Sequence, residues 1–306
     1  MQHIAFVGLG KMGRPIARHL AQKSMAGTQR LTAFDANASQ TVGIEATGLT
    51  ATTDRDAIDG AQILFTCLPD GDVVEDAVFG SDGLAQHLAP DAIVVDLSTI
   101  EHAKAVAIGR RLEADGNRFL DCPVSGAPAG AEAGTLTVMC GGDSATFATI
   151  KPLLERFSAT VLHMGPLGSG QLTKTVNNVI YDINIAAIAE VLPMAVAMGL
   201  DPEQIATVVT TGTSRSFASE YFVPRILKGL FDEGYPLAKA YKDLVSCAEV
   251  GMKHGVPMPL TAAATATYQT TMRQGHGDRD KGAMILPFEA LLGVQVRAGR
   301  KNPAKG

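Results

Sequence analysis

A glycine-rich segment near the start of the chain constrains the fold more than any other feature of the sequence. It follows an apolar run, residues 3–7, and leads into a helical pattern, residues 12–22. In this order of strand, turn and helix, the first glycine permits the tight turn, the second lets the backbone approach a pyrophosphate, and the third allows close packing. The amino end of the helix adds unpaired N–H groups and the positive end of its dipole. A purely structural turn is the alternative, but the context predicts a dinucleotide-binding loop formed by Gly8, Leu9, Gly10, Lys11, Met12 and Gly13.

Short apolar runs recur through the first half of the chain. Most of them are rich in Val, Ile, Leu or Phe, and helical patterns such as 12–22 and 103–114 lie between several of them. Strands that alternate with helices predict a mostly parallel sheet, and continuous apolar strands predict one that is covered on both faces. The runs are 3–7, 31–34, 63–66, 92–95, 119–120, 136–140 and 160–162.

The pattern changes after Gly170, where strand-like runs stop and helical patterns follow one another. We expect helices over 172–198, 202–211, 218–228, 238–254, 260–274 and 280–292. The sequence therefore predicts an α/β fold, with a Rossmann-like doubly wound sheet at the N-terminus followed by an all-α C-terminal domain. We place the boundary at the Gly-rich stretch Gly165–Gly170, which gives a NAD-binding domain over 1–164 and a helical substrate and dimerisation domain over 165–306.

The long helix expected over 172–198 has an unusual composition. Its only charged residues are Lys174, Asp182 and Glu190. A helix that is apolar nearly all round is buried on most sides, so we expect it to lie between domains or subunits. A charged lysine near the start of a helix that is expected to be buried suggests a functional role for Lys174.

The second expected strand ends at Asp35. An acidic residue at this position can bind the ribose hydroxyls of NAD and would repel the 2′-phosphate of NADP. No Arg or Lys follows until Arg55. NAD is therefore the expected cofactor, with NADP less favoured; a solvated turn residue is the alternative for Asp35.

Composition excludes several classes of protein. The 306 residues carry a net charge of −5, which argues against nucleic acid as a partner. No uninterrupted run of 18 apolar residues or secretory signal is present, so we expect no membrane partner and a cytoplasmic location. The histidines lack ligand spacing, so no bound metal is expected. Four cysteines without a CxxC pair predict buried, reduced thiols: Cys67, Cys122, Cys140 and Cys247.

Several short motifs follow one another along the chain. They are GLGKMGRPIA at 8–17, Cys67-Leu68-Pro69, Asp96-Leu97-Ser98-Thr99-Ile100, Asp121-Cys122-Pro123-Val124-Ser125-Gly126 with glycines at 130 and 134, GSGQLTKTVNN at 168–178, and the weaker Lys242-Asp243-Leu244. In this order they resemble the β-hydroxyacid dehydrogenase family, which includes 3-hydroxyisobutyrate dehydrogenase and tartronate semialdehyde reductase. The resemblance covers nearly the whole chain.

The resemblance implies that Lys174 is the catalytic acid/base. Desolvation and the positive end of the helix dipole would lower the pKa of a lysine at this position, so that it can exchange a proton with the substrate hydroxyl. Asn178 shares a helix face with Lys174 and can orient the lysine or hold the substrate. A lysine that reaches from the helix end to solvent is the alternative.

The resemblance also implies the remaining site residues. Ser125 and Gly126 should bind the substrate carboxylate, unless they form an ordinary loop. The family has a second glycine where this chain has Ala127, and Pro128 follows, so the pocket wall should be reshaped. Asp243 should lie beside the substrate; a solvated helix face is its alternative. The remaining cofactor contacts implied by the family are Leu68, Pro69, Thr99 and Lys242. Thr99 could instead cap the helix that follows it.

These observations predict an NAD-dependent oxidoreductase that transfers a hydride between nicotinamide and a short hydroxy acid resembling 3-hydroxyisobutyrate. The alternatives are a tartronate semialdehyde reductase, a dehydrogenase of a larger polar acid such as threonate, and, in another class, a non-catalytic NAD-binding sensor. The resemblance further implies a homodimer or homotetramer.

Overall fold

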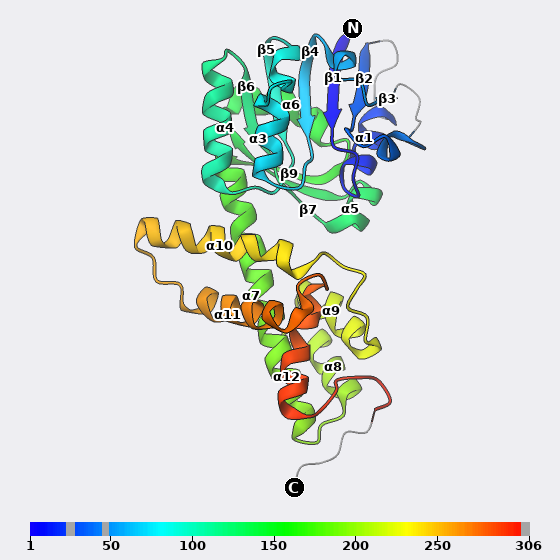
Figure 1. The fold of residues 1–306 in the computed structure, drawn as a ribbon, viewed down its shortest axis with the longest axis vertical. Coiled ribbons are helices and arrows are strands. Elements are labelled where there is room, and N and C mark those ends of the chain that lie inside the picture. Colours follow the sequence, from blue (N-terminus) through cyan, green and yellow to red (C-terminus); the bar gives the residue numbers. More distant parts are fainter. Residues whose placement is uncertain (23–27, 45–48, 301–306) are drawn as a thin grey trace. The chain divides into compact units, whose positions relative to one another are not determined.

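The computed structural model describes residues 1–22, 28–44 and 49–300, which form two units (Figure 1). The first unit comprises Met1–Lys174 and the second Thr175–Gly306. This division falls inside a helix, after the Gly-rich stretch where the sequence suggests a boundary. Each unit is described by itself.

Within the described residues, nine strands of the first unit form one sheet in the order β3-β2-β1-β4-β5-β6-β8-β7, and β9 pairs with β8. All pairings from β3 to β6 are parallel, whereas β8 runs antiparallel to β6 and β7. The expected mostly parallel sheet is confirmed. The strands are β1 (Gln2–Val7), β2 (Gln29–Phe34), β3 (Leu49–Thr52), β4 (Ala61–Thr66), β5 (Leu88–Asp96), β6 (Arg118–Asp121), β7 (Val124–Ser125), β8 (Leu136–Gly142) and β9 (Ser158–Gly165).

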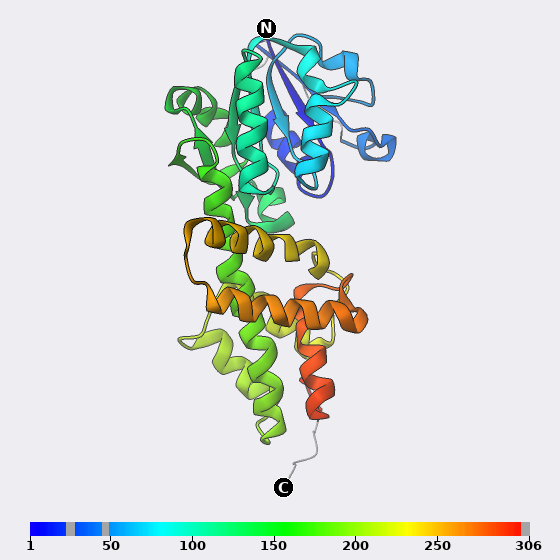
Figure 2. The same ribbon diagram turned by 60° about the vertical axis from the view of Figure 1, so that its left-hand side comes forward.

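Apolar side chains on both faces of the sheet explain why its central strands read as continuous hydrophobic runs. In β1, Ile4 and Phe6 belong to one buried cluster, while Ala5 and Val7 belong to another on the opposite face. The first face is covered by α1 (Gly13–Gln22), α5 (Ala127–Ala133) and α6 (Ser144–Leu154). The second is covered by α3 (Gly71–Phe79) and α4 (His102–Ala114), as Figure 2 shows from the side.

Some short elements of the first unit have no counterpart in the predicted pattern. Strand β3 pairs only with β2 at the sheet edge and is partly exposed, so its sequence lacks a buried apolar run. Helix α3 begins with a glycine, a poor helix former, but Asp70 caps it by accepting a hydrogen bond from the Val73 N–H. The four-residue helix α2 (Ala38–Thr41) buries no side chain.

The second unit is helical, and its described β structure is a single bridge between Pro236 and Asp280. Its helices enclose one buried core that includes Ile185, Phe222 and Tyr268. The expected all-α domain is confirmed. The elements are α7 (Ser169–Ala197, which begins in the first unit), α8 (Pro202–Thr211), α9 (Phe217–Lys228), α10 (Leu237–His254), α11 (Pro259–Thr271), a π-turn (Met272–His276), a 3₁₀ turn (Lys281–Met284) and α12 (Ile285–Leu292).

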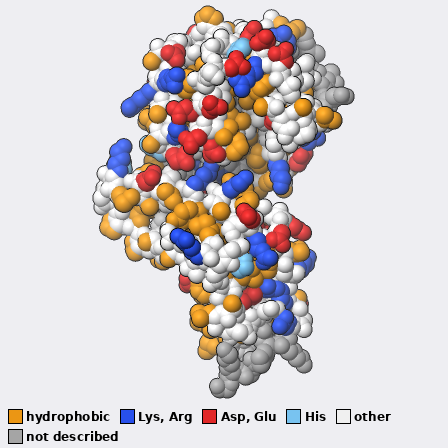
Figure 3. All heavy atoms as spheres, in the orientation of Figure 1, with side chains coloured by type: hydrophobic (Ala, Val, Ile, Leu, Met, Phe, Trp, Pro, Cys, Tyr) orange, Lys and Arg blue, Asp and Glu red, His pale blue; other side chains and the backbone are white. Residues whose placement is uncertain are grey.

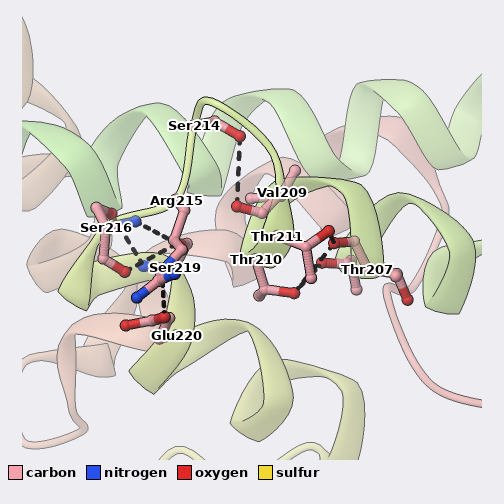
Figure 4. A network of polar contacts seen from close by, with 10 residues as sticks. Thr207, Val209, Thr210, Thr211, Ser214, Arg215, Ser216, Ser219 and Glu220 are labelled. Carbon is pink, nitrogen blue, oxygen red and sulfur yellow. Dashed lines mark hydrogen bonds and ion pairs between the residues drawn. The ribbon is translucent and has the colours of Figure 1, made fainter.

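Polar contacts fix the connection between α8 and α9 (Figure 4). Ser216 and Ser219 form a reciprocal capping box at the start of α9, which satisfies backbone N–H groups that the helix leaves open. Arg215 pairs with Glu220 at 2.6 Å, and the Ser214 hydroxyl donates to the Val209 carbonyl at the end of α8. The connection is thereby held by its own residues.

Within the single chain, part of the apolar surface of α7 remains exposed, and burial of this helix between subunits stays a prediction. Val176, Ile180, Val191 and Met194 are each about half exposed. The internal charge of this helix is compensated, because Asp182 is buried against Lys281 and accepts a hydrogen bond from the Tyr268 hydroxyl at 2.8 Å. By length and composition alone α7 could cross a membrane, but core helices of soluble proteins pass the same test, and 56% of its most apolar window is buried.

Candidate active site

The parallel strands place the predicted cofactor segments at one edge of the sheet. Because parallel strands end at the same edge, the residues that follow them form a common surface, where open α/β sheets bind ligands. Chain order reverses between β1 and β4, which is the switch point of the sheet. The residues that directly follow β1, β2, β4, β5 and β6 are Gly8, Asp35, Cys67, Leu97 and Cys122.

The glycine loop has the geometry of a phosphate cradle. A Cβ on Gly13 would lie 1.8 Å from the Gly8 carbonyl oxygen, and a Cβ on Gly8 would lie 2.3 Å from the Cys67 carbonyl oxygen, so both positions exclude a side chain. A Cβ on Gly10 would meet nothing within 4 Å. The open space lies where the backbone of the second glycine approaches a pyrophosphate in this motif. The residues present therefore fit a dinucleotide.

Asp35 is tied to the glycine loop. Its carboxylate accepts hydrogen bonds from the Leu9 N–H at 2.7 Å and from the Asn37 N–H at 2.8 Å. It is half-buried, and a carboxylate has further lone pairs with which to accept ribose hydroxyls. Arg55, the next cation in the sequence after Asp35, lies over the Phe34 ring and pairs with Asp82. The surroundings of Asp35 thus match a ribose site.

The segments after β4 and β5 are joined to each other. The Leu68 N–H donates to the Ser98 hydroxyl at 2.9 Å, which brings the predicted cofactor residue Leu68 next to the segment that contains Thr99. Pro69 is exposed. Helix α4 begins at His102 with Glu101 in the cap position, so the alternative of Thr99 as its cap is wrong.

The predicted substrate loop forms a tight turn from β7 into α5. Ser125 ends β7, Gly126 has φ +135°, and Ala127 has φ +56°. Positive φ is uncommon for residues other than glycine and is worth noting at a site. Gly126 and Ala127 are exposed and Ser125 is half-buried, so the loop can be reached by a ligand.

Two residues to which the sequence assigned no role fix the start of α7. The Asp121 carboxylate accepts hydrogen bonds from the Gly168 N–H at 2.7 Å and the Gln171 N–H at 2.8 Å. Burial raises the pKa of Asp121 to about 6, while these hydrogen bonds oppose the rise. The Gln171 amide donates to the Ser98 carbonyl at 2.7 Å, and its oxygen accepts from the Ile100 N–H. Asp121 lies in the same sequence motif as Ser125, and Gln171 lies in the same motif as Lys174. This proximity was the signal in the sequence that could have identified them.

Lys174 and Asn178 lie on successive turns of α7, and both are half-buried. In the helical unit, the Asn178 amide donates to the Asp243 carboxylate at 2.8 Å, which joins two of the predicted substrate residues. Lys242 lies beside Asp243 on α10 and is also half-buried. Asn178 and Asp243 thus form a hydrogen-bonded pair of an amide and a carboxylate, and Asn178 lies one helical turn along α7 from Lys174.

Three of the four cysteines are buried as expected, but Cys67 is partly exposed, because it belongs to the loop after β4. All four are free. The thiols of Cys122 and Cys140 lie 3.0 Å apart, and burial raises the pKa of Cys122, which keeps this thiol protonated.

Among the described residues, one group of side chains has the spacing of metal ligands: Asp56, Asp59 and His87. Asp59 and His87 precede β4 and β5, at the opposite edge of the sheet from the glycine loop, and both aspartates are exposed. This group is separate from the candidate site.

Two family models together match most of the chain. The NAD binding domain of 6-phosphogluconate dehydrogenase matches residues 3–165. The domain described as NAD-binding of NADP-dependent 3-hydroxyisobutyrate dehydrogenase matches residues 168–288.

Individual proteins resemble the chain over nearly its full length. The 2-(hydroxymethyl)glutarate dehydrogenase of Eubacterium barkeri is 33% identical, with 97% of this chain and 98% of the relative covered. The NAD-dependent L-serine dehydrogenase of Pseudomonas aeruginosa is also 33% identical, covering 96% and 100%. A structure of Mycobacterium tuberculosis 3-hydroxyisobutyrate dehydrogenase with L-serine is 30% identical, with a TM-score of 0.81 over 94% of this chain and 99% of that one.

Proposed function

Because the chain belongs to the β-hydroxyacid dehydrogenase family and is an NAD(P)-dependent oxidoreductase, we propose that it oxidises a 3-hydroxy acid whose alcohol is primary. Reduction of the corresponding semialdehyde acid would use the same groups in reverse. The substrates named for the relatives carry this proposal. 2-(Hydroxymethyl)glutarate, L-serine and 3-hydroxyisobutyrate all contain a hydroxymethyl group on the carbon that bears the carboxylate, and they differ in the other substituent of that carbon.

The residues of this chain have defined roles in the proposed reaction. The Ser125 hydroxyl and the N–H groups of the turn at Gly126 bind the carboxylate. The Lys174 amine takes the hydroxyl proton at Nζ as the carbonyl forms, and returns it in the reverse direction. Asn178 holds the hydroxyl, and its bond to Asp243 fixes the orientation of its amide. When bound, NAD supplies the hydride acceptor.

The cofactor would be held by the glycine loop, Asp35 and the segments after β4 and β5. The loop supplies backbone N–H groups and the open space at Gly10 for the pyrophosphate. Asp35 accepts the ribose hydroxyls, and its negative charge favours NAD over NADP. Leu68, Pro69 and Thr99 would contact the remainder of the dinucleotide, and Lys242 is proposed to contribute from the helical unit.

A homo-oligomeric, cytoplasmic enzyme remains our proposal for the assembly and location of the chain. The exposed apolar side chains of α7 support burial against a second copy. Nucleic acid and membrane partners are not part of the proposal.

The function is tested by initial rates of nicotinamide reduction with NAD and NADP in parallel. The acids would be 3-hydroxyisobutyrate, 3-hydroxypropionate, L-serine, 2-(hydroxymethyl)glutarate, glycerate and threonate. We expect one of the first five to give the highest kcat/KM, and NAD to exceed NADP. A preference for threonate, whose 3-hydroxyl is secondary, would overturn the substrate class, and a preference for glycerate together with reduction of tartronate semialdehyde would favour the reductase alternative.

Replacing Lys174 with Ala separates the proposed enzyme from a non-catalytic NAD-binding sensor. We expect kcat to fall by about 10²–10⁴-fold, the usual contribution of a general acid/base, while the Kd for NAD is unchanged. Lys151→Ala, at an exposed lysine of α6, is the control for loss of one positive charge. Retained turnover in Lys174→Ala would exclude the proposed proton transfer, and no turnover of any acid by the wild-type protein, with NAD bound, would favour the sensor.

A further inference from the structure

We propose that Asp121 and Gln171 are positioning residues, which hold the first turn of α7 so that Lys174 is presented in one fixed orientation. The proposal extends the proposed function, because it assigns to these two buried side chains the placement of the proton carrier. Neither side chain is expected to contact the substrate.

Asp121 holds the backbone of the helix start. One oxygen of its carboxylate accepts from the Gly168 N–H and the other from the Gln171 N–H, at 2.7 and 2.8 Å. These donors are among the N–H groups that a helix leaves without internal partners. An N-terminal cap is usually supplied by the residue just before the helix, whereas here it comes from the end of β6, in a distant part of the sequence. The strand that leads into the substrate loop is thereby bonded to the helix that carries Lys174.

Gln171 holds the same turn from a second direction. Its side chain is fully buried and makes two hydrogen bonds to one backbone segment, donating to the Ser98 carbonyl and accepting from the Ile100 N–H. That segment follows β5 and also accepts a hydrogen bond from the Leu68 N–H through the Ser98 hydroxyl. The turn before Lys174 is thus bonded to the predicted cofactor segments as well.

Close packing leaves the helix start no room to shift. A Cβ on Gly170 would lie 2.3 Å from the Asp121 carbonyl oxygen and 2.4 Å from the Met139 carbonyl oxygen. A Cβ on Gly141 would lie 2.4 Å from the Asp121 carboxylate. The glycines allow the helix to approach the strand ends, and the two polar side chains then fix it there.

Lys174 follows Gln171 by one helical turn, so the orientation of that turn sets the direction of the lysine. A misplacement of about 1 Å at a reacting group can cost about 100-fold in rate. Removal of the Gln171 hydrogen bonds should therefore lower kcat more than it weakens cofactor binding.

The main test is a double-mutant cycle between Gln171→Met and Lys174→Ala, assayed with 3-hydroxyisobutyrate. Methionine has a similar length and removes both hydrogen bonds. We expect Gln171→Met to lower kcat by about 10–100-fold in the wild-type background. In the Lys174→Ala background we expect about twofold or less, because the residue acts through the lysine.

Gln171→Glu tests whether the same hydrogen bonds, restored at low pH, also restore kcat. When protonated, the new carboxyl can donate to the Ser98 carbonyl and accept from the Ile100 N–H, as the amide does. We expect kcat near the wild-type value at low pH, falling as the pH rises and the carboxyl ionises, relative to the wild-type profile. Thr32→Val is the matched control, since it removes a buried hydrogen bond to His3 at the amino-terminal part of the sheet. We expect that control to leave kcat unchanged.

Hydrogen exchange provides a readout that does not depend on the substrate. We expect faster exchange of the amides of residues 168–175 in Gln171→Met and in Asp121→Asn, with the rest of the sheet unchanged. Equal losses of kcat in both lysine backgrounds, or an equal loss in Thr32→Val, would overturn the positioning role. If the wild-type protein oxidises no hydroxy acid, the proposed function fails, and unchanged exchange at 168–175 would separately refute the fixed helix start.

Discussion

Ala127 lies in the substrate loop with a backbone conformation that favours glycine. Its φ is +56°, directly after Gly126 at +135°. The left-handed conformation costs an alanine about 1–2 kcal/mol, because its Cβ crowds the following carbonyl. The family resemblance places glycine at this position, so the chain carries a local strain in the segment proposed to bind the carboxylate.

Replacing Ala127 with Gly should stabilise the protein. We expect the free energy of unfolding to rise by about 0.5–1 kcal/mol, which is the relieved strain less the greater backbone entropy that glycine loses on folding. Urea denaturation followed by circular dichroism measures this difference.

Ala129→Gly is the control for the Ala127 prediction. Ala129 is also exposed and lies in the same helix, but its φ is not positive. The control should lose about 0.5–1 kcal/mol, because glycine is unfavourable within a helix. A loss of stability in both variants would show that Ala127 is not strained.

At the scale of elements, different glycines of the loop between β1 and α1 serve the packing of the protein and the binding of a ligand. Two of its glycines are required by the protein itself, since a side chain at Gly8 or Gly13 would overlap a backbone carbonyl oxygen. The third, Gly10, has open space in front of it. The motif therefore contains residues selected for packing and one available for the ligand.

Gly10→Ala should affect NAD binding, whereas Gly13→Ala should affect the stability of the protein. We expect Gly10→Ala to keep the melting temperature of the apoprotein but to weaken NAD binding at least about tenfold, because its methyl group occupies the pyrophosphate space. We expect Gly13→Ala to lower the melting temperature, since its Cβ would lie 1.8 Å from the Gly8 carbonyl oxygen. Thermal denaturation and isothermal titration calorimetry with NAD measure the two effects. Wild-type NAD affinity in Gly10→Ala would show that the pyrophosphate lies elsewhere.

At the scale of the whole molecule, the helical unit leaves apolar side chains at its surface, where Figure 3 shows them among polar and charged ones. Contiguous exposed apolar patches usually mark an interaction site. The apolar side chains near the end of α7 and on α8 are between 46% and 78% exposed: Val191, Met194, Met198, Leu200 and Val208.

Sedimentation velocity should show an oligomer that depends on this surface. We expect the wild-type chain to sediment as a dimer or larger, and Met194→Glu to shift it toward the monomer, because a charge in an apolar interface is costly to desolvate. Lys253→Glu, at an exposed position of α10, is the control. A wild-type monomer at all concentrations would contradict the proposed assembly.

The architecture and the chemical type of this protein can be predicted from its amino-acid sequence. Apolar runs such as residues 3–7 predict buried strands because a sheet covered on both faces requires them, and the spacing of glycines at 8, 10 and 13 is meaningful within one short segment. Lys174 and Asn178 are predicted from the family motif in which they lie, and four residues along one helix is a local distance. Each of these features depends on residues close together in the chain.

The contacts that hold the start of α7 cannot be predicted from the sequence, because they form between distant segments of the chain. Asp121 and Gln171 meet their partners across separations of 47 to 73 residues, and such contacts exist only after the strands have paired in a particular order. The positive φ of Ala127 likewise follows from where β7 must turn into α5. A buried polar side chain forms hydrogen bonds with the backbone groups that the fold leaves without partners. The sequence pattern does not show which backbone groups these are.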